Sequence, residues 1–215
     1  MSDPYLYPGS FILKNKFDIK DSNLLEKLEK EATTISINRI RKNPIKGNFN
    51  FEHLKKVHFE MFKRVYEWAG EQRTINISKS ESVLNGMMFE YSRCDNIQNE
   101  VKENLSKLNS IEWKNISLED RVDNLSQIIT NVWKAHPFRE GNTRTTIIFF
   151  SQFAKEKGFK LNEKLLIDNI AYFRNSLVAA SFEDKELGVS RNYRHLNRIL
   201  KDSMKSNVKQ QEKGL

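Results

Sequence analysis

Apolar residues recur every three to four positions along most of the chain, which is the spacing of one face of an α-helix. The spacing predicts helices over residues 22–43, 51–70, 95–108, 117–135, 142–158, 162–182 and 191–204. The chain has only 4 Pro and 8 Gly, so few turns are expected and the helices should be long. The pattern therefore predicts an all-α fold, a helical bundle.

The ends and faces of several helices can also be predicted. In the first helix, with Asp21 or Ser22 as N-cap, the apolar positions are Leu24, Leu28, Ala32, Ile35 and Ile40. In the second, which Asn50 can cap and Gly70 can end, they are Leu54, Val57, Met61, Val65 and Trp68. The third has Ile97, Val101, Leu105 and Leu108 on one face. The fourth opens with Ser117 and Asp120 at the spacing of a capping box.

One segment departs from helical spacing. In RTINISKSESVLNGMMFEY, Ile75 and Ile77 alternate with polar residues, which is the period of a β-strand. A polar turn is expected at Lys79–Ser82, and Asn85–Gly86 offers a second turn. We therefore expect a small β-hairpin, or flap, within the helical domain.

The polar loop between the fourth and fifth helices carries the candidate chemistry. HPFREGNTRT runs from His136 to Thr145. The helix before it contains Leu125, Ile128, Ile129, Val132 and Trp133, and the helix after it contains Ile147, Ile148, Phe149, Phe150 and Phe153. Helices this apolar belong in the centre of a domain, so the core should hold the loop in place.

The residue types in this loop are those of a phosphoryl or nucleotidyl transfer site. Gly141, Asn142 and Thr143 begin a helix whose first N–H groups can bind an anion, and Arg144 and Arg139 can add charged hydrogen bonds. Glu140 beside such a site can hold Mg²⁺, and His136 can accept a proton near neutral pH. Phe138 is expected to point inward and anchor the loop. The alternative is a well-capped loop with an ordinary histidine and an exposed Glu140–Arg144 pair.

The loop resembles that of the Fic-domain family, which reads His-x-Phe-x-Asp/Glu-Gly-Asn-Gly-Arg-x-x-Arg. DPYLYPGSFILKNKFDI and VYEWAGEQRTINISKS also resemble this family's N-terminal arm and flap, so the similarity covers roughly residues 3–200. The resemblance implies a helical bundle with a flap beside the active-site loop. It also implies a protein adenylyltransferase, which moves AMP from ATP to a Ser, Thr or Tyr hydroxyl of a target protein (AMPylation).

The resemblance also assigns roles. It makes His136 the general base and Glu140 the ligand of Mg²⁺, with ATP as co-substrate. It places the nucleotide phosphates on Gly141, Asn142, Thr143 and Arg144. The flap, at about residues 73–84, would dock the target by strand pairing through Thr74, Ile75, Asn76, Ile77, Ser78 and Lys79.

Two positions depart from the family pattern. Thr143 replaces the second glycine, and Ile147 replaces the last arginine, which would hold the γ-phosphate. The alternative function is therefore a nucleotide-binding Fic-fold module with weak or no catalysis, or an enzyme using another nucleotide. The family's inhibitory Ser/Thr-x-x-x-Glu-Gly/Asn pattern does not occur in the sequence. No glutamate-based inhibition in cis is expected, and a separate antitoxin-like inhibitor stays open.

Length and charge add only a little to what can be predicted about domains and partners. A chain of 215 residues with no internal repeat or linker favours an arm over residues 1–20, one domain over 21–205 and a frayed tail over 206–215. The net charge of +8 indicates an acidic partner, although a solvated basic face explains it equally well. No recognition motif accompanies the charge, so nucleic acid is not the expected partner.

The expected location is the cytoplasm. The first ten residues lack a charged region followed by an apolar run, so no secretory signal is expected. No apolar stretch is long enough for a membrane span. Delivery into another cell without a signal peptide stays open. A single cysteine, Cys94, rules out an intrachain disulfide and a cysteine-based zinc site.

Overall fold

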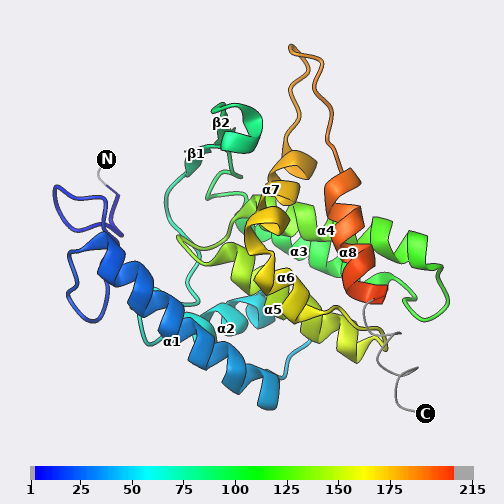
Figure 1. Cartoon of the computed structure of the whole chain (residues 1–215), viewed down its shortest axis with the longest axis horizontal. Helices are drawn as coiled ribbons and strands as arrows, with labels where there is room; N and C mark the ends of the chain where they lie inside the picture. The colour runs from blue at the N-terminus through cyan, green and yellow to red at the C-terminus, as the bar shows by residue number, and fades with distance from the viewer. Residues whose placement is uncertain (1–2, 206–215) are drawn as a thin grey trace.

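Two buried helices, α4 (Leu118–Ala135) and α5 (Asn142–Glu156), form the centre of the fold. In this computed structural model, which describes residues 3–205, α4 packs against α3, α5, α7 and α8, and α5 packs against α2, α6 and α7. The other helices are α1 (Ser22–Lys42), α2 (Phe51–Phe62), α3 (Ile97–Ser110), α6 (Glu163–Asp168), α7 (Ile170–Ser181) and α8 (Arg194–Lys205). Figure 1 shows α1 and α2 on one side of the molecule and α3, α4 and α8 on the other. The predicted all-α bundle with one small hairpin is confirmed.

Local capping signals place several helix starts as the sequence predicts. The Asp21 side chain accepts a hydrogen bond from Leu24 N, Asn50 accepts one from His53 N, and Ser117 accepts one from Asp120 N. Each of these bonds satisfies an N–H group that has no partner within its own helix.

The buried face of α1 agrees with the prediction only in part, since Ile40 is buried and Leu28 and Ala32 pack against the core. Leu24 and Ile35 are exposed, and the buried positions are Leu25, Glu29, Thr33, Ser36, Ile37 and Ile40. The prediction followed apolar spacing alone. Glu29 and Thr33 are turned inward, where they bind Arg144 at the start of α5.

Helix α2 ends at Phe62, eight residues before the predicted end at Gly70. The chain then turns back on the helix, and the Gly70 N–H donates to Nδ1 of the buried His58 at 2.8 Å. Gly70 has φ +81, and a Cβ at this position would lie 2.8 Å from Phe59 Cβ. This close approach explains why the residue is a glycine. Gly70 ends a turn that packs on α2, and it does not end the helix.

The flap is a hairpin of β1 (Ser78–Ser80) and β2 (Met88–Glu90), joined through the short 3₁₀ helix η1 (Ser82–Leu84). The strands are antiparallel, with Lys79 opposite Phe89. The predicted turn at Lys79–Ser82 is wrong, because the chain reverses at Asn85–Gly86, where both φ angles are positive. The strand begins only at Ser78, and residues 74–77, which include Ile75 and Ile77, precede it. η1 contacts α7, which sets the flap beside that helix (Figure 1).

Residues 162–182 form two helices instead of one, with the break at Asn169. Residues 3–21 contain no helix and only a single bridge between Leu6 and Leu13. The predicted tail over 206–215 lies outside the described residues. None of the helices within residues 3–205 is long and apolar enough to cross a bilayer.

The buried His58 should make stability depend on pH. Its Nδ1 accepts from Gly70 N and its Nε2 lies 3.0 Å from the Glu140 carbonyl oxygen, so the ring is neutral with the proton on Nε2. Burial lowers the pKa of His58 to about 3. Below about pH 6.5 the unfolded chain therefore binds a proton that the folded chain does not, and the free energy of unfolding falls as the pH is lowered.

We expect His58→Gln to flatten this dependence, because a glutamine offers an acceptor and a donor but does not titrate. Between pH 6 and 5 the slope should decrease by up to about 1.4 kcal/mol per pH unit. Urea unfolding at each pH measures it, with His195→Gln, at an exposed position, as the control. Equal slopes in wild type and His58→Gln would contradict the assignment.

Candidate active site

The α4–α5 loop forms one wall of a cavity of about 420 Å³. Side chains from α1, the flap, the loop, the start of α5 and the start of α7 line it: Glu26, Lys79, His136, Glu140, Gly141, Asn142, Thr143, Arg144, Ile170, Ala171 and Arg174. The loop residues predicted to act on a nucleotide therefore lie at this one cavity, with the exception of Arg139. Of the six flap residues predicted to dock a target, only Lys79 lines it.

His136 lies at the C-terminal end of α4 with a left-handed backbone, φ +48. Its ring packs on Tyr91 of the flap segment, with 3.7 Å between ring centroids, and approaches Trp133 edge-on. Nδ1 is enclosed and has no hydrogen-bond partner within the described part of the chain. Ring packing and backbone conformation, rather than a carboxylate, therefore orient this histidine.

The surroundings of His136 keep it neutral. Burial first, and then the positive charges of Lys79, Arg73 and Arg174, lower the pKa of His136 well below its usual value. A neutral imidazole has a free lone pair and can accept a proton at pH 7. Bound phosphate groups would offset these positive charges and raise the basicity of the ring.

Arg73 ties the backbone of His136 to the flap. The side chain is 1% exposed, and its Nε donates to the His136 carbonyl oxygen at 2.7 Å. The other guanidinium nitrogens donate to the carbonyl oxygens of Ile75, Ser92 and Ala135. Sequence spacing does not reveal this residue, because its four side-chain hydrogen bonds join three segments, at residues 75, 92 and 135–136, that meet only in the fold.

Helix α5 begins without a cap. Gly141 is the N-cap residue, and no side chain accepts from the first N–H groups of the helix. These N–H groups are left for a ligand and form a site for an anion such as phosphate. Gly141 has φ +81, and a Cβ there would overlap the ring of Phe62. The glycine is thus required by its backbone conformation and by the Phe62 ring.

The loop is held from inside by Asn142 and Phe138. The Asn142 side chain accepts from Phe138 N at 3.0 Å and donates to the Phe138 carbonyl oxygen at 2.8 Å. The Phe138 ring is buried and stacks on His58, with 3.8 Å between centroids. The Asn142 amide thus holds the loop closed, and the backbone N–H of Asn142 lies at the uncapped start of α5.

Glu140 is the carboxylate of the cavity. Its Oε1 accepts from Gly141 N at 2.8 Å, and Oε2 has no such partner among residues 3–205. Burial raises the pKa of Glu140, but Lys79, Arg144, the Gly141 N–H and Arg139 outweigh burial and lower this pKa below its usual value. The side chain is therefore ionised near neutral pH, as a metal ligand must be.

Arg144 is fixed by α1. Its Nη2 lies 2.5 Å from Glu29 Oε1, and Nη1 donates to Thr33 Oγ1 at 3.2 Å. Tyr66 donates its hydroxyl to the other oxygen of Glu29, and burial followed by the Glu29 charge raises the pKa of Tyr66 above its usual range. The guanidinium also lies over the ring of Phe62. Glu29, Thr33 and Tyr66 thus position Arg144 at the wall of the cavity.

The two departures from the family pattern differ in their surroundings. The Thr143 hydroxyl oxygen accepts a hydrogen bond from the buried Trp133 Nε1 at 3.0 Å. Ile147 is 1% exposed and belongs to the core, not to the cavity. The cavity therefore has no cation from position 147.

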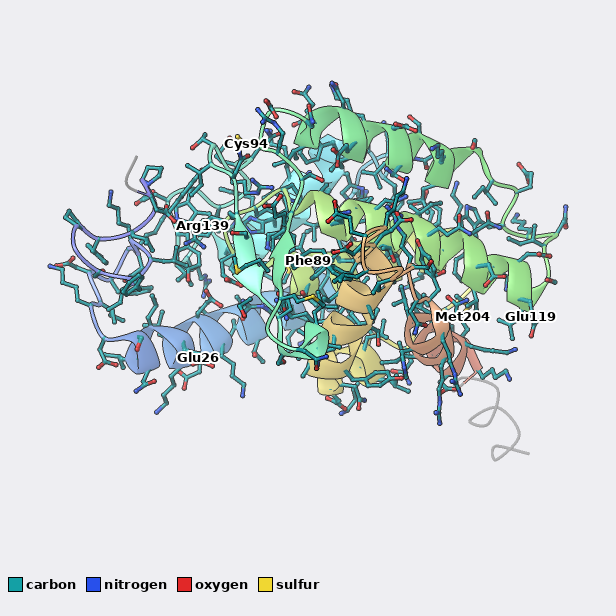
Figure 2. The ribbon with its side chains drawn as sticks, turned by 90° about the horizontal axis from the view of Figure 1, so that it is seen from above. Glu26, Phe89, Cys94, Glu119, Arg139 and Met204 are labelled. Carbon is teal, nitrogen blue, oxygen red and sulfur yellow. The ribbon has the colours of Figure 1, made fainter. Side chains whose placement is uncertain are left out.

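Lys79 and Arg174 supply other cations. Both line the cavity, and Arg174 forms a two-point pair with Glu81 of the flap, at 2.8 and 2.6 Å. Sequence reasoning missed Arg174, Glu81 and Glu26 because no motif marks them. Arg139, expected to bind anions, instead pairs with Asp3 and lies beside the N-terminal arm (Figure 2).

The predicted docking residues lie along the approach to the flap. Thr74, Asn76 and Ser78 are exposed, whereas Ile75, Ile77 and Lys79 are half-buried. Thr74 N donates to the Tyr5 hydroxyl, and Asn76 Oδ1 accepts from Cys94 N. In the described part of the chain β1 pairs only with β2, so the outer edge of β1 carries no further strand.

These features define a helical bundle with a cavity between the α4–α5 loop and a β-flap. A family model described as the Fic/DOC family matches residues 48–154. A probable protein adenylyltransferase of Sinorhizobium fredii is 30% identical over 168 residues, which is 77% of this chain and 82% of that protein. The chain belongs to the Fic/DOC family.

Other relatives agree with this assignment. A protein adenylyltransferase of Bartonella schoenbuchensis is 29% identical over 161 residues, covering 75% of this chain and 32% of that protein. The chain thus spans about a third of that relative's length. The solved N-terminal Fic domain of an effector from Bartonella sp. 1-1C superposes with a TM-score of 0.79 at 22% identity, covering 96% of this chain and 97% of that one.

Removing the Glu29 carboxylate should destabilise the fold, because Arg144 and the Tyr66 hydroxyl would both lose a partner. We expect Glu29→Ala to lower the free energy of unfolding by roughly 2 kcal/mol. Glu26→Ala, one turn earlier on the same helix and exposed, should change it by less than about 0.5 kcal/mol. Urea unfolding followed by circular dichroism measures both. Equal stability of the two variants would show that the Arg144 contact contributes little.

Proposed function

We propose that this chain is a Mg²⁺-dependent protein adenylyltransferase that moves AMP from ATP to a Ser, Thr or Tyr hydroxyl of a target protein. The observation that carries the proposal is the cavity in which neutral His136 lies beside the uncapped start of α5. An anion site and a proton acceptor in one cavity are what phosphoryl-type transfer requires. A Fic protein from Bartonella tribocorum solved with AMPPNP, 23% identical with a TM-score of 0.73, adds support.

The reaction follows from the positions of these groups. The target hydroxyl oxygen attacks the α-phosphorus of ATP, and the bond from this phosphorus to the bridging oxygen breaks. Pyrophosphate leaves with the electron pair, and the hydroxyl proton passes to a ring nitrogen of His136. The N–H groups of Asn142 and Thr143 and the guanidinium of Arg144 hold the phosphate oxygens while negative charge shifts to the leaving group.

The residues present fit a magnesium ion. Within residues 3–205 no group of three or more His, Cys, Asp and Glu side chains could hold a metal ion. Mg²⁺ does not need such a cage, because it is commonly held by one or two carboxylates together with phosphates and water. Glu140, with Oε2 unpaired, supplies that carboxylate. When bound, the ion offsets phosphate charge.

The flap suits the docking of an extended target segment. A strand added to the outer edge of β1 would bring a side-chain hydroxyl near His136, since Lys79 of β1 already lines the same cavity. Thr74, Ile75, Asn76, Ile77, Ser78 and Lys79 are the proposed docking residues.

A specific observation favours the second candidate, a nucleotide-binding module with little transfer. Ile147 is buried in the core, so no cation from that position reaches a γ-phosphate. Weak grip on the leaving pyrophosphate would slow the transfer step more than the binding of the nucleoside.

The two candidates separate in one assay. The chain is incubated with Mg²⁺ and each of ATP, GTP, CTP and UTP, alone and with bacterial lysate, and intact mass is recorded. We expect an added nucleoside monophosphate with ATP, at a rate reduced at least about 100-fold in His136→Ala. His195→Ala, at an exposed position, should transfer normally. Nucleotide binding without any mass increment would favour the binding module.

The lowered pKa of His136 predicts the pH profile. Because the free enzyme keeps this base neutral well below pH 6.5, kcat/KM should stay level as the pH falls through 6.5 and decline only at lower pH. Lys79→Met removes a nearby positive charge and should move this decline to higher pH. ATP also ionises in this pH range, but equally with both proteins. The shift of the profile between wild type and Lys79→Met therefore reports on the enzyme alone. Coincident profiles would exclude His136 as the titrating base.

A further inference from the structure

The Thr143 hydroxyl lies between a buried indole and the cavity. Trp133 is fully buried, and its Nε1–H donates to Thr143 Oγ1 at 3.0 Å. Thr143 is only partly buried, and it lines the cavity together with His136 and Arg144. It follows Asn142, the first residue of α5, so it lies among the uncapped N–H groups.

The bond from Trp133 determines what the hydroxyl can do. An indole N–H can only donate, so the threonine oxygen must accept, and the O–H proton remains to be donated elsewhere. No residue among 3–205 accepts a hydrogen bond from this hydroxyl. Trp133 therefore holds the side chain in one orientation and leaves a donor for a ligand of the cavity.

The two arginines that line the cavity are already engaged. Both terminal nitrogens of Arg144 bind α1, through Glu29 and Thr33. Both terminal nitrogens of Arg174 bind Glu81. Ile147 supplies no charge. Carboxylates thus offset much of the positive charge in the cavity. A neutral donor at the start of α5 therefore contributes a larger share of the binding of an anion.

We propose that the Thr143 hydroxyl donates a hydrogen bond to a phosphate oxygen of the nucleotide, and that Trp133 orients it for this. Thr143 is then a phosphate-binding residue of this chain at a position where the family pattern has a glycine, which has no side-chain donor. The inference rests on the proposed function, because it concerns a nucleotide in the same cavity.

A purely structural role gives a different expectation. If the hydroxyl serves only to satisfy the Trp133 N–H, Thr143→Val leaves that N–H unpaired and lowers stability, and ligand affinity changes only through distortion of the site. Such distortion would affect adenosine as well as ATP. A direct bond to phosphate affects only ligands that carry phosphate.

The test compares two ligands by calorimetry: adenosine and α,β-methylene-ATP with Mg²⁺, in which the bond that breaks during transfer is blocked. We expect Thr143→Val to weaken the ATP analogue by about tenfold or more and adenosine by less than about twofold. Thr143→Ser keeps the hydroxyl and should restore affinity for the ATP analogue. Equal loss for both ligands, or no loss for either, would overturn the proposal.

A double variant separates the phosphate bond from the indole bond. In Thr143→Val combined with Trp133→Phe, both partners are apolar and no N–H is left unpaired. The structural role predicts that affinity for the ATP analogue returns, whereas a phosphate bond predicts that it stays low. If Trp133→Phe does not fold, the comparison of the ATP analogue with adenosine in Thr143→Val still decides.

The same experiment distinguishes this inference from the proposed function. If the wild-type chain transfers AMP and Thr143→Val binds the ATP analogue as tightly as wild type, only the inference fails. If the wild-type chain binds no nucleotide, both fail.

Discussion

The arrangement of the candidate site depends on one neutral imidazole in the core. His58 accepts a hydrogen bond from Gly70 N through Nδ1 and approaches the Glu140 carbonyl oxygen through Nε2. Its ring lies between the rings of Phe62 and Phe138. A single side chain thus joins α2, the turn after α2 and the active-site loop. Because the ring uses both nitrogens, a proton on Nδ1 would break the bond to Gly70. Burial and hydrogen bonding therefore both favour the neutral imidazole.

The buried guanidinium of Arg73 likewise joins separate segments, at the other end of the α4–α5 loop. Arg73 donates to carbonyl oxygens at the end of α4 and at both sides of the flap base. No carboxylate is among these hydrogen-bond partners, so backbone carbonyl dipoles stabilise the charge of Arg73 without neutralising it. This positive charge helps to lower the pKa of His136. The hydrogen bonds of Arg73 therefore hold the backbone of His136, and the charge of Arg73 contributes to the neutral state of that imidazole.

Local signals explain which parts of the fold could be predicted. The caps at Asp21, Asn50 and Ser117 act within one helical turn, and the face of α3 follows apolar spacing, so both agree with the sequence analysis. The face of α1, the end of α2 and the turn of the flap depend on tertiary contacts. Glu29 is buried because Arg144 lies opposite, and α2 stops where Gly70 must reach His58. No local pattern contains that information.

The residues of the candidate site also fall into a part that could be predicted from the sequence and a part that could not. The loop from His136 to Arg144 is one contiguous motif and could be recognised as a unit, whereas Lys79, Arg174 and Glu26 reach the cavity from three separate elements.

The charges that surround this cavity show why positions 143 and 147 have to be considered together. Arg144 and Arg174 each face a carboxylate, Glu29 and Glu81, so neither arginine is a free cation. A polyphosphate must compete with these carboxylates or bind through donors that have no anionic partner. Lys79, the N–H groups at the start of α5 and the Thr143 hydroxyl are such donors. They line the cavity next to His136, while position 147 adds no cation to it. In the proposed reaction, this distribution favours tight contact at the transferred phosphate and loose contact with the leaving pyrophosphate.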